Sequence, residues 1–592
     1  MKGVSIRYGD VAPEAKESFI ATSSETQFGD RYQVQFKQYN MDFPNWASPC
    51  EYYQTSLDGT ATAIPSETEN AMVGLWSTQL SDEMGNFATE IILTLVADGN
   101  YASEGLTFTF DTYNQIFPTE LYIEWYRGDE RIDYDTFYPD EAFYFCKKKV
   151  TAYNKVIITF NKINMPYTRL RLQSIEYGYG TFFKGDELRN VNIIQEIDPI
   201  SSQISVNVVD FTLDSNKDVV YSFTAKQPLS VYWEGNLVEA TFVTQSKRLS
   251  KKMWKVQSED YIGLMQNVPF YGGMYNNTSV EDLLNEIFLW QSETNTTKIP
   301  YQLEDELKDE TVTGYIPITN CRDALMQVAF AIQAVVDTSN SSAVRIYRLR
   351  DNNEEEIQHI PLNRIKQGQN FEDDETVTSV SLTAHEYVRQ EEDAAFDIEV
   401  FNNTETGETG KNIFVIFEKP CSELRWTSDI TMIKQDVNYC IFDVEEGRAA
   451  SIGGKTYVHN RTVKEKRNEN ALANEVEKII TIENATLVSA RNVDNVLNNC
   501  YNWLVKTRST NLSIVEGKHV QYGSKIRYGE KKYGTEFKYG EKYPDLVTYD
   551  NKTHVGENIS AETEYLGIVE GRIIKQKYNL NGNILVKESV VR

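Results

Sequence analysis

Apolar and polar positions alternate in short runs along most of this chain. Five such runs follow one another in its first third, at Glu90–Val96, Gly105–Asp111, Glu120–Tyr126, Val156–Phe160 and Thr168–Ile175. A period of two places every second side chain on the same face, so each run predicts a half-buried strand. Gly- and Asn-bearing segments between the runs predict turns. Short strands joined by turns are typical of a β-sandwich or jelly roll, which we predict over residues 1–185.

The alternation resumes in two later parts of the chain. Ile204, Val206 and Val208 alternate with polar residues, and Leu237–Val243 continues the pattern. This predicts a β unit over residues 186–265. A further β unit over residues 371–485 is predicted from similar runs, with Gly453 and Gly454 as a hairpin turn.

A helical period appears in three places. Ser279 followed by Asp282 is a helix-starting pair that precedes an apolar stripe. Asn320 precedes the run 324–336, which is apolar on nearly every face and therefore predicts a buried helix. Residues 492–506 place their apolar side chains along one side of a helix. The first two helices predict an α/β domain over residues 266–370, and the third a helix-plus-β domain over residues 486–592.

The amino-acid sequences of three segments resemble a known family. Gly314–Leu349, which reads as strand, apolar helix and strand, resembles the hub proteins of phage tails and phage-tail-like particles. The segment Asp260–Tyr275 and the closing hairpin Glu570–Arg592 are similar to the same family. The resemblance implies a mainly β fold with α/β segments, in which tube-like β-barrels at 186–265 and 371–485 alternate with α/β domains. The strand rhythm of residues 1–185 resembles galactose-binding-like jelly rolls.

The resemblance also implies a function. Such a hub is a structural virion component of the baseplate or tail tip, and it forms a homotrimeric ring. Two barrels from each subunit match the hexameric tail tube protein above, and a central spike or tip protein sits below. Other baseplate proteins are expected partners, and assembly is expected in the bacterial host cytoplasm, for a phage or a phage-tail-like bacteriocin. The family offers no catalytic residue, so we expect no enzyme.

Composition and charge agree with a large, mostly β protein. The 592 residues suggest about four domains, and the 36 tyrosines and 27 phenylalanines favour strands. The net charge of -28 is scattered in short clusters, which predicts a solvated surface and disfavours stable nucleic-acid binding. The cysteines are dispersed without a CxxC pair, which suits reduced thiols. We expect no signal peptide and no membrane insertion.

Sequence motifs that carry chemistry are missing. The histidines form no HExxH pattern, so we expect no metal site. GxSxG, GxGxxG and GxxxxGK[ST] do not occur, so we expect no cofactor. Gly453–Thr456 imitates only the end of a phosphate-binding loop, because Ala449 stands where its first glycine belongs. Paired carboxylates across a sugar cleft are the catalytic arrangement that the sequence leaves open.

Two groups of tyrosines are candidate contact sites. A Tyr-Gly repeat forms either a partner contact or an exposed Lys- and Glu-rich hairpin, and its tyrosines are Tyr522, Tyr528, Tyr533 and Tyr539. Tyr122 and Tyr126 are candidate glycan contacts, whereas Trp125, on the opposite face of the same strand, suits the core. The alternative function is therefore a carbohydrate-active enzyme or a glycan-binding adhesin that uses the N-terminal sandwich.

Overall fold

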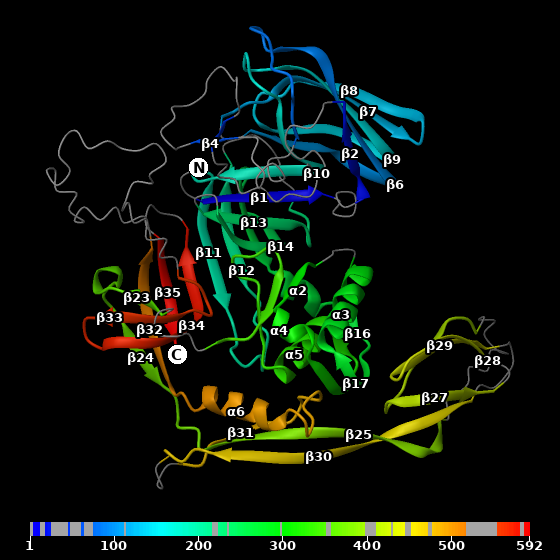
Figure 1. Cartoon of the computed structure of the whole chain (residues 1–592), viewed down its shortest axis with the longest axis vertical. Helices are drawn as coiled ribbons and strands as arrows, with labels where there is room; N and C mark the ends of the chain where they lie inside the picture. Colours follow the sequence, from blue (N-terminus) through cyan, green and yellow to red (C-terminus); the bar gives the residue numbers. More distant parts are fainter. Residues whose placement is uncertain are drawn as a thin grey trace.

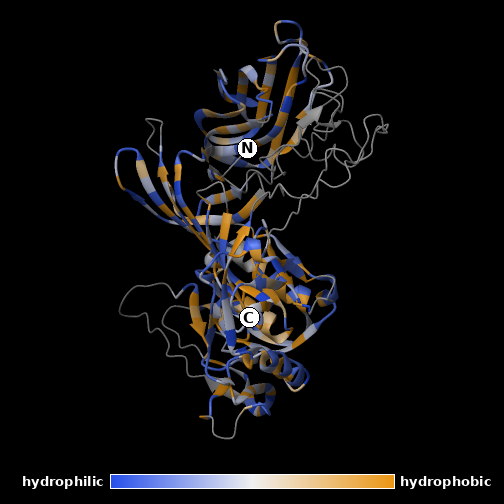
Figure 2. Cartoon of the chain, turned by 90° about the vertical axis from the view of Figure 1, so that its left-hand side faces the viewer, coloured by the Kyte–Doolittle hydropathy of each residue, from blue (hydrophilic) through white to orange (hydrophobic). Residues whose placement is uncertain are grey.

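The computed structural model confirms a mainly β fold with α/β segments (Figure 1). Along the strands, hydrophobic and hydrophilic residues alternate (Figure 2). The structure describes residues 4–11, 18–24, 45–47, 61–63, 75–111, 114–215, 223–233, 236–295, 299–350, 357–396, 410–427, 430–444, 451–471, 476–516, 553–580 and 585–592.

An antiparallel sheet forms most of the N-terminal region. Its strands are β2 (Ile20–Ser23), β5 (Leu75–Trp76), β6 (Asn86–Phe110), β7 (Pro118–Arg127), β8 (Glu130–Phe137), β9 (Phe143–Ile163) and the first half of β10 (Arg171–Lys184), with β3 (Asn45–Ala47) and β4 (Ala61–Ala63) as a separate pair. The five predicted strands are confirmed. The predicted turn between the first two is wrong, because β6 continues through residues 97–104. The pairing of β6 with β9 shifts register in this segment, so its Gly and Asn residues lie at irregularities within one continuous strand.

A second antiparallel sheet joins both ends of the chain. It contains β1 (Val4–Val11), the second half of β10, β11 (Leu188–Glu196), β12 (Val208–Asp214), β13 (Pro228–Trp233), β14 (Asn236–Arg248) and β15 (Met253–Glu259). β1 lies between β10 and β13, and β11 pairs with β34 from the end of the chain. The strand β10 therefore belongs to both sheets, since its first half pairs with β6.

The α/β unit is built around one large apolar cluster. Its elements are α2 (Tyr261–Gln266), β16 (Pro269–Phe270), β17 (Gly273–Ser279), α3 (Val280–Asn295), β18 (Tyr301–Leu303), α4 (Asp305–Lys308), β19 (Thr311–Ile316), β20 (Thr319–Asn320), α5 (Cys321–Ala331), β21 (Val335–Asp337) and β22 (Val344–Tyr347). The helix starts at Ser279 and Asn320 are confirmed, and the Asn320 side chain accepts the Asp323 amide. The predicted extension of α5 to Val336 is wrong. Gln333 adopts a left-handed φ of 57°, and the β-branched Val335 and Val336 then pair with β22.

Residues 379–504 form a long sheet, a smaller sheet and a helix. The elements are β25 (Ser379–Phe396), β26 (Ile413–Ile416), β27 (Cys421–Trp426), β28 (Ile430–Gln435), β29 (Tyr439–Val444), β30 (Ile452–Arg467), β31 (Ile479–Ile482) and α6 (Val493–Leu504). The predicted helix at 492–506 is confirmed, and it packs on β25 and β30. The predicted turn at Gly453 and Gly454 is wrong, because both lie inside β30. A Cβ on Gly454 would stand 2.5 Å from the Cys421 Sγ, so the glycine permits close approach of β27.

The last unit combines a short middle segment with the C-terminal strands. It contains β23 (Gln358–Ile360), the 3-10 helix η4 (Leu362–Arg364), β24 (Asn370–Asp373), β32 (Arg508–Glu516), β33 (Asn558–Thr563), β34 (Gly567–Asn579) and β35 (Leu585–Val591). Strand pairing crosses the predicted boundaries after residues 185 and 485. Among the described residues of 371–485, the strands form an open four-stranded and an open three-stranded sheet. The division into five domains and the second tube-like barrel stay predictions.

Candidate functional site

The structure offers an interaction surface on the part that extends beside the body. We call β25, β27 and β30, together with the small sheet of β26, β28 and β29, the arm; it reaches past the α/β unit in Figure 1. Val388 and Val458 are direct cross-strand partners in the arm, yet they are 47% and 42% exposed. Among the described residues, nearly half of the exposed large apolar side chains lie between 371 and 479.

The small sheet of the arm is apolar on both faces. Ile413 and Val415 of β26 point inward, toward a cluster that includes Phe442. Phe414 and Ile416 point the other way and are 42% and 53% exposed, and the Phe414 ring also packs beside Tyr271 and Tyr439 with centroids 5.4 Å apart. A sheet that is apolar on both sides is normally covered on both sides, so this outward face has the composition of an interface.

Polar side chains anchor the arm to the α/β unit. Asn438, which is buried, donates from Nδ2 to the Tyr271 carbonyl at 2.6 Å. The Tyr315 hydroxyl donates to Asn438 Oδ1 at 2.8 Å. The Tyr271 ring also packs against Tyr439, with centroids 4.8 Å apart. This contact holds the β28–β29 hairpin against the segment between β16 and β17.

A stack of rings extends this anchor along the arm. Tyr315 packs against Tyr387, whose ring stacks on His459 at 4.4 Å between centroids. The imidazoles of His385 and His459 share a hydrogen bond of 2.8 Å between Nδ1 and Nε2. Burial, followed by the neighbouring His459 and Arg461, lowers the pKa of His385 to about 4. Both rings of this pair are therefore neutral at pH 7. The sequence shows the two histidines as 74 residues apart, and only the β25–β30 register brings them together.

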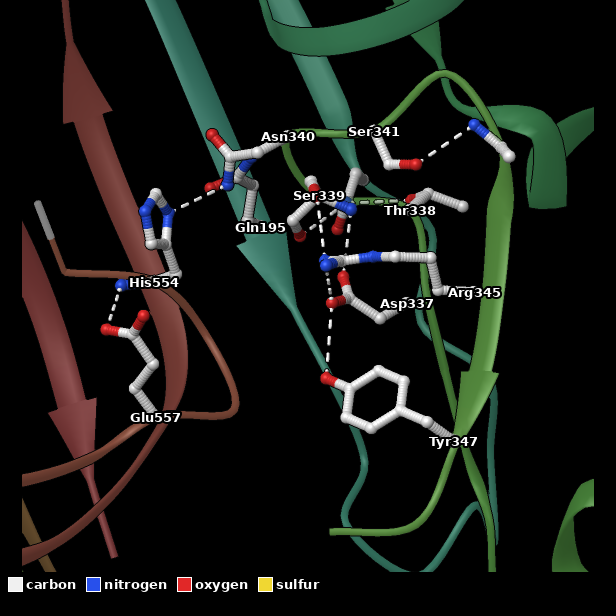
Figure 3. A network of polar contacts seen from close by, with 12 residues as sticks. Gln195, Asp337, Thr338, Ser339, Asn340, Ser341, Arg345, Tyr347, His554 and Glu557 are labelled. Atoms are coloured by element: carbon white, nitrogen blue, oxygen red, sulfur yellow. Dashed lines mark hydrogen bonds and ion pairs between the residues drawn. The ribbon is translucent and has the colours of Figure 1, made fainter. Parts of the chain in front are cut away.

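A buried polar network joins the α/β unit to the neighbouring sheets (Figure 3). Asp337, at the end of β21, accepts from Arg345 at 2.5 Å and from the Tyr347 hydroxyl at 3.3 Å. The same Arg345 donates to the Ser339 carbonyl at 2.9 Å. These contacts fix the loop that follows β21 against the paired strand β22.

Two buried carboxyl groups lie behind this loop. Glu239 accepts from Gln195 Nε2 at 2.7 Å, and Asp260 accepts from the Thr338 hydroxyl at 2.6 Å. Asn207 reaches Thr338 at 3.0 Å and lies between the two carboxyl groups. Burial raises the pKa of Asp260 to about 6 and raises the pKa of Glu239 well above its usual value, with the Asp260 charge adding to the second effect. Both carboxyl groups are fully buried, so a sugar substrate cannot reach them. Their hydrogen bonds instead hold neighbouring segments of the chain together.

The C-terminal unit meets the same network. Asn340 contacts His554 at 3.0 Å, and the His554 amide donates to Glu557 at 2.9 Å, as Figure 3 shows. Behind them, Lys587 and Glu516 form a buried ion pair at 3.3 Å, and Lys587 also contacts the Thr553 carbonyl. Strand, loop and helix segments far apart in sequence are thus held by a closed set of polar contacts.

The candidate glycan residues lie on one face of β7. Tyr122 and Tyr126 are half-buried on the side opposite Trp125, whose predicted place in the core is confirmed. Tyr122 packs near Tyr134 of β8, with centroids 6.2 Å apart, and Tyr134 is 56% exposed. Arg131 pairs with Glu124 at 2.5 Å, and its guanidinium lies over the Tyr134 ring at 4.9 Å from the centroid. The structure therefore groups aromatic and charged side chains there, and Tyr134 is a member that the sequence analysis missed.

Other predicted features have the following outcomes. The tyrosines of the Tyr-Gly repeat, Tyr522, Tyr528, Tyr533 and Tyr539, lie outside the described residues. Within the described ranges, no group of three or more His, Cys, Asp or Glu side chains is placed to hold a metal ion. No described helix is both long and apolar enough to cross a membrane. The described cysteines are buried: Cys146, Cys321, Cys421, Cys440 and Cys500.

Comparisons with known proteins give partial likenesses in shape. No protein-family model matches the sequence, and no curated protein sequence matches it. A tail protein from Neisseria meningitidis is 8% identical with a TM-score of 0.39, over 68% of this chain and 91% of that one. A prophage tail protein from Shewanella oneidensis is 9% identical with a TM-score of 0.39, over 70% and 96%. A prophage tail protein from Listeria monocytogenes is 10% identical with a TM-score of 0.37, over 70% and 91%.

Proposed function

We propose that this chain is a structural, non-enzymatic component of a phage tail or phage-tail-like particle. In this proposal it is a homotrimeric hub in the baseplate or tail tip. The ring takes two β units from each subunit, residues 186–265 and 371–485, and so presents six units to a hexameric tail tube protein. A central spike or tip protein lies on the other side, and other baseplate proteins contact the rim.

The observation that carries the proposal is the apolar surface of the arm. Val388, Val458, Phe414 and Ile416 are exposed in one chain, although each sits on an ordered strand. Burial of apolar surface contributes about 25 cal/mol per Å², so covering this face in an assembly is favourable. A ring of identical subunits gives each arm the same partner surface, which is the closed arrangement common to soluble oligomers.

The internal contacts support the same role. The N-terminal strand β1 and the C-terminal strands β34 and β35 are woven into the central part of the molecule. The polar network of Asp337, Asp260 and Glu239 closes the junctions between units. These contacts should keep the subunit rigid when neighbouring subunits bind to it, as a subunit of a ring requires.

Mass in solution tests the proposal. Light scattering on the full chain is expected to give three times the 68.0 kDa of one chain. The triple variant Val388→Ser, Val458→Ser and Ile416→Ser is expected to weaken the trimer while its circular dichroism stays unchanged. The matched control is Met84→Ser with Tyr138→Ser, two exposed apolar residues of the N-terminal region that should leave the trimer intact. A wild-type chain that remains monomeric at high concentration contradicts the proposal.

A second candidate function concerns the N-terminal region alone. The neighbouring rings of Tyr122 and Tyr134, with the paired Arg131 and Glu124 beside them, favour a peripheral glycan contact. Tyr126 lies on the same face, under Lys155 at 5.2 Å. Calorimetric titration with host cell-wall glycans tests this contact, and Tyr134→Ala is expected to remove binding without affecting the trimer. The Tyr-Gly repeat is proposed as a further partner contact within the particle.

A further inference from the structure

The hairpin of β14 and β15 is an isolated basic element on an acidic molecule. Between Glu239 and Glu259 the sequence has no acidic residue, while the chain as a whole has a net charge of -28. The hairpin carries five basic side chains, and every residue from 244 to 252 is exposed. These basic residues are Lys247, Arg248, Lys251, Lys252 and Lys255.

The ladder of this hairpin keeps like charges together. Lys247 and Lys255 are direct cross-strand partners, an arrangement that destabilises an isolated hairpin. Within the described part of the chain, neither lysine has an acidic partner at ion-pair distance. Arg248 instead shapes the tip, because its guanidinium donates to the carbonyls of Ser250 and Lys251 at 3.0 and 2.9 Å. The guanidinium carbon of Arg248 also lies over the buried Trp254 ring, 5.4 Å from its centroid. The tip is therefore ordered and positively charged.

A surface of opposite charge lies on the α/β unit. Glu281 and Asp282 in the first turn of α3 and Asp309 after α4 are exposed, and the described residues offer them no ion pair. The hydrogen bond from the Val280 amide to the Glu310 carbonyl, at 2.8 Å, brings the two segments side by side. Among the described basic residues of this region, Lys308 is already paired with Asp305 at 2.7 Å and Arg348 with Glu310 at 2.6 Å.

These two surfaces cannot meet within one chain. The α/β unit begins with α2, which follows β15 directly after Glu259, and α3 reaches α2 through α5. The basic tip is at the other end of β15, a strand of seven residues that spans roughly 20 Å. Contact between a surface at one end of one copy and a surface at the other end of the next copy is head-to-tail, and such an interface gives a ring when its rotation closes.

We propose that the basic β14–β15 hairpin of one subunit docks on the acidic face formed by Glu281, Asp282 and Asp309 of a second copy of this chain. The inference rests on the proposed trimer and assigns two surfaces to its interface. The neighbour's carboxylates relieve the repulsion between Lys247 and Lys255. The arm supplies apolar burial, and the hairpin supplies orientation and salt dependence.

Charge reversal tests this contact on the full chain. Lys247→Glu, Lys252→Glu and Lys255→Glu together are expected to weaken trimer association by roughly ten- to a hundredfold at low salt. Glu281→Lys, Asp282→Lys and Asp309→Lys together are expected to do the same. The chain with all six substitutions is expected to regain most of the association. The matched control reverses three exposed lysines elsewhere, Lys184, Lys366 and Lys577.

The readouts are mass by sedimentation and its dependence on salt. Wild-type association is expected to weaken toward 1 M salt, where the screening length is about 3 Å. A trimer that is insensitive to both sets of reversals overturns the docking contact and leaves the proposed function standing. A monomeric wild type overturns both. Retention on an anionic polymer such as heparin that is lost on hairpin reversal, with the trimer unchanged, assigns the hairpin to such a polymer and overturns the contact between copies.

Discussion

The buried polar junction between the structural units differs from the exposed apolar face of the arm. At the junction, polar groups are buried and paired: Asp337 with Arg345, and Lys587 with Glu516. On the arm, apolar groups such as Val388 and Ile416 are exposed on ordered strands. The first arrangement is complete within one chain, whereas the second gains free energy only when another surface covers it. The contacts that stabilise one chain thus lie apart from the surface on which chains associate. Mutations should therefore affect the stability of the chain and its self-association separately.

The largest expected effect is at the junction. Lys587→Ala leaves Glu516 as a buried charge without its partner, and should lower the free energy of unfolding by about 3–5 kcal/mol. Urea denaturation measures it. Lys308→Ala, which removes an exposed ion pair with Asp305, is the control and should change stability by less than about 1 kcal/mol. Equal losses in the two variants would remove the distinction between junction and surface.

A smaller effect is expected inside the arm. Gly454→Ala adds a Cβ that would overlap the Cys421 Sγ and the Ser422 carbonyl, which stand 2.5 and 2.8 Å away. β27 has to move, at a cost of about 1–3 kcal/mol. Gly128→Ala is not a clean control, because its φ of 60° adds strain; Gly185, with open space around it, is the suitable site for Ala. Thermal unfolding of the two variants gives the comparison.

The anchor of the arm should depend on pH. The pKa of His385 is about 4 in the folded chain and 6.5 in the unfolded one, so the unfolded chain binds the extra proton between these values. Stability is therefore full above pH 6.5 and falls as pH falls toward 4, by at most about 3 kcal/mol. His459 and Arg461, which face this imidazole, add to its resistance to protonation.

Replacing the imidazole tests that pH dependence. His385→Asn should flatten the unfolding free energy between pH 6.5 and 4. Asp260 acts in the opposite sense, because its pKa is raised to about 6 and its contribution declines as pH rises through that value. Asp260→Asn is therefore measured beside it, because this variant should remove the opposite pH dependence. If His385→Asn leaves the pH dependence of the unfolding free energy unchanged, the loss of stability at low pH does not come from His385 in the arm.

The smallest expected effect on stability, and the sharpest contrast, comes from the outer face of the arm. Val388→Ser with Val458→Ser should change the free energy of unfolding of a dilute monomer by less than about 0.5 kcal/mol per site, because both side chains are already exposed. The same change should weaken self-association measurably. If instead the monomer loses several kcal/mol, these valines belong to the arm's own core and not to an interface.

The sequence predicted local features well and long-range pairing poorly. Asn320 and Ser279 start helices where their side chains predict, because a cap depends on neighbours a few residues away. The predicted C-terminal end of α5 and the predicted turn at the start of β30 are wrong. A glycine in a strand looks like a turn until its partner strand is known, and Gly454 is explained only by Cys421.

The candidate site shows the same limit. Tyr122 and Tyr126 were identified from strand alternation, whereas Tyr134 joins them only through the β7–β8 register. The His385–His459 pair and the Asn438 anchor depend on segments distant in sequence, and no local pattern marks them. The basic run from Lys247 to Lys255 is different, because its residues are neighbours in the sequence, although the sequence analysis did not single it out.

The strand β10 has a mechanical consequence. Its residues 171–177 are hydrogen-bonded in the N-terminal sheet and its residues 178–184 in the next sheet, without a linker between them. A tensile load applied to the N-terminal region passes into the body along one continuous backbone. The load acts in shear on the hydrogen bonds between β10 and β6 and on those between β10 and β1. Tension should therefore reach the second sheet without stretching a flexible hinge.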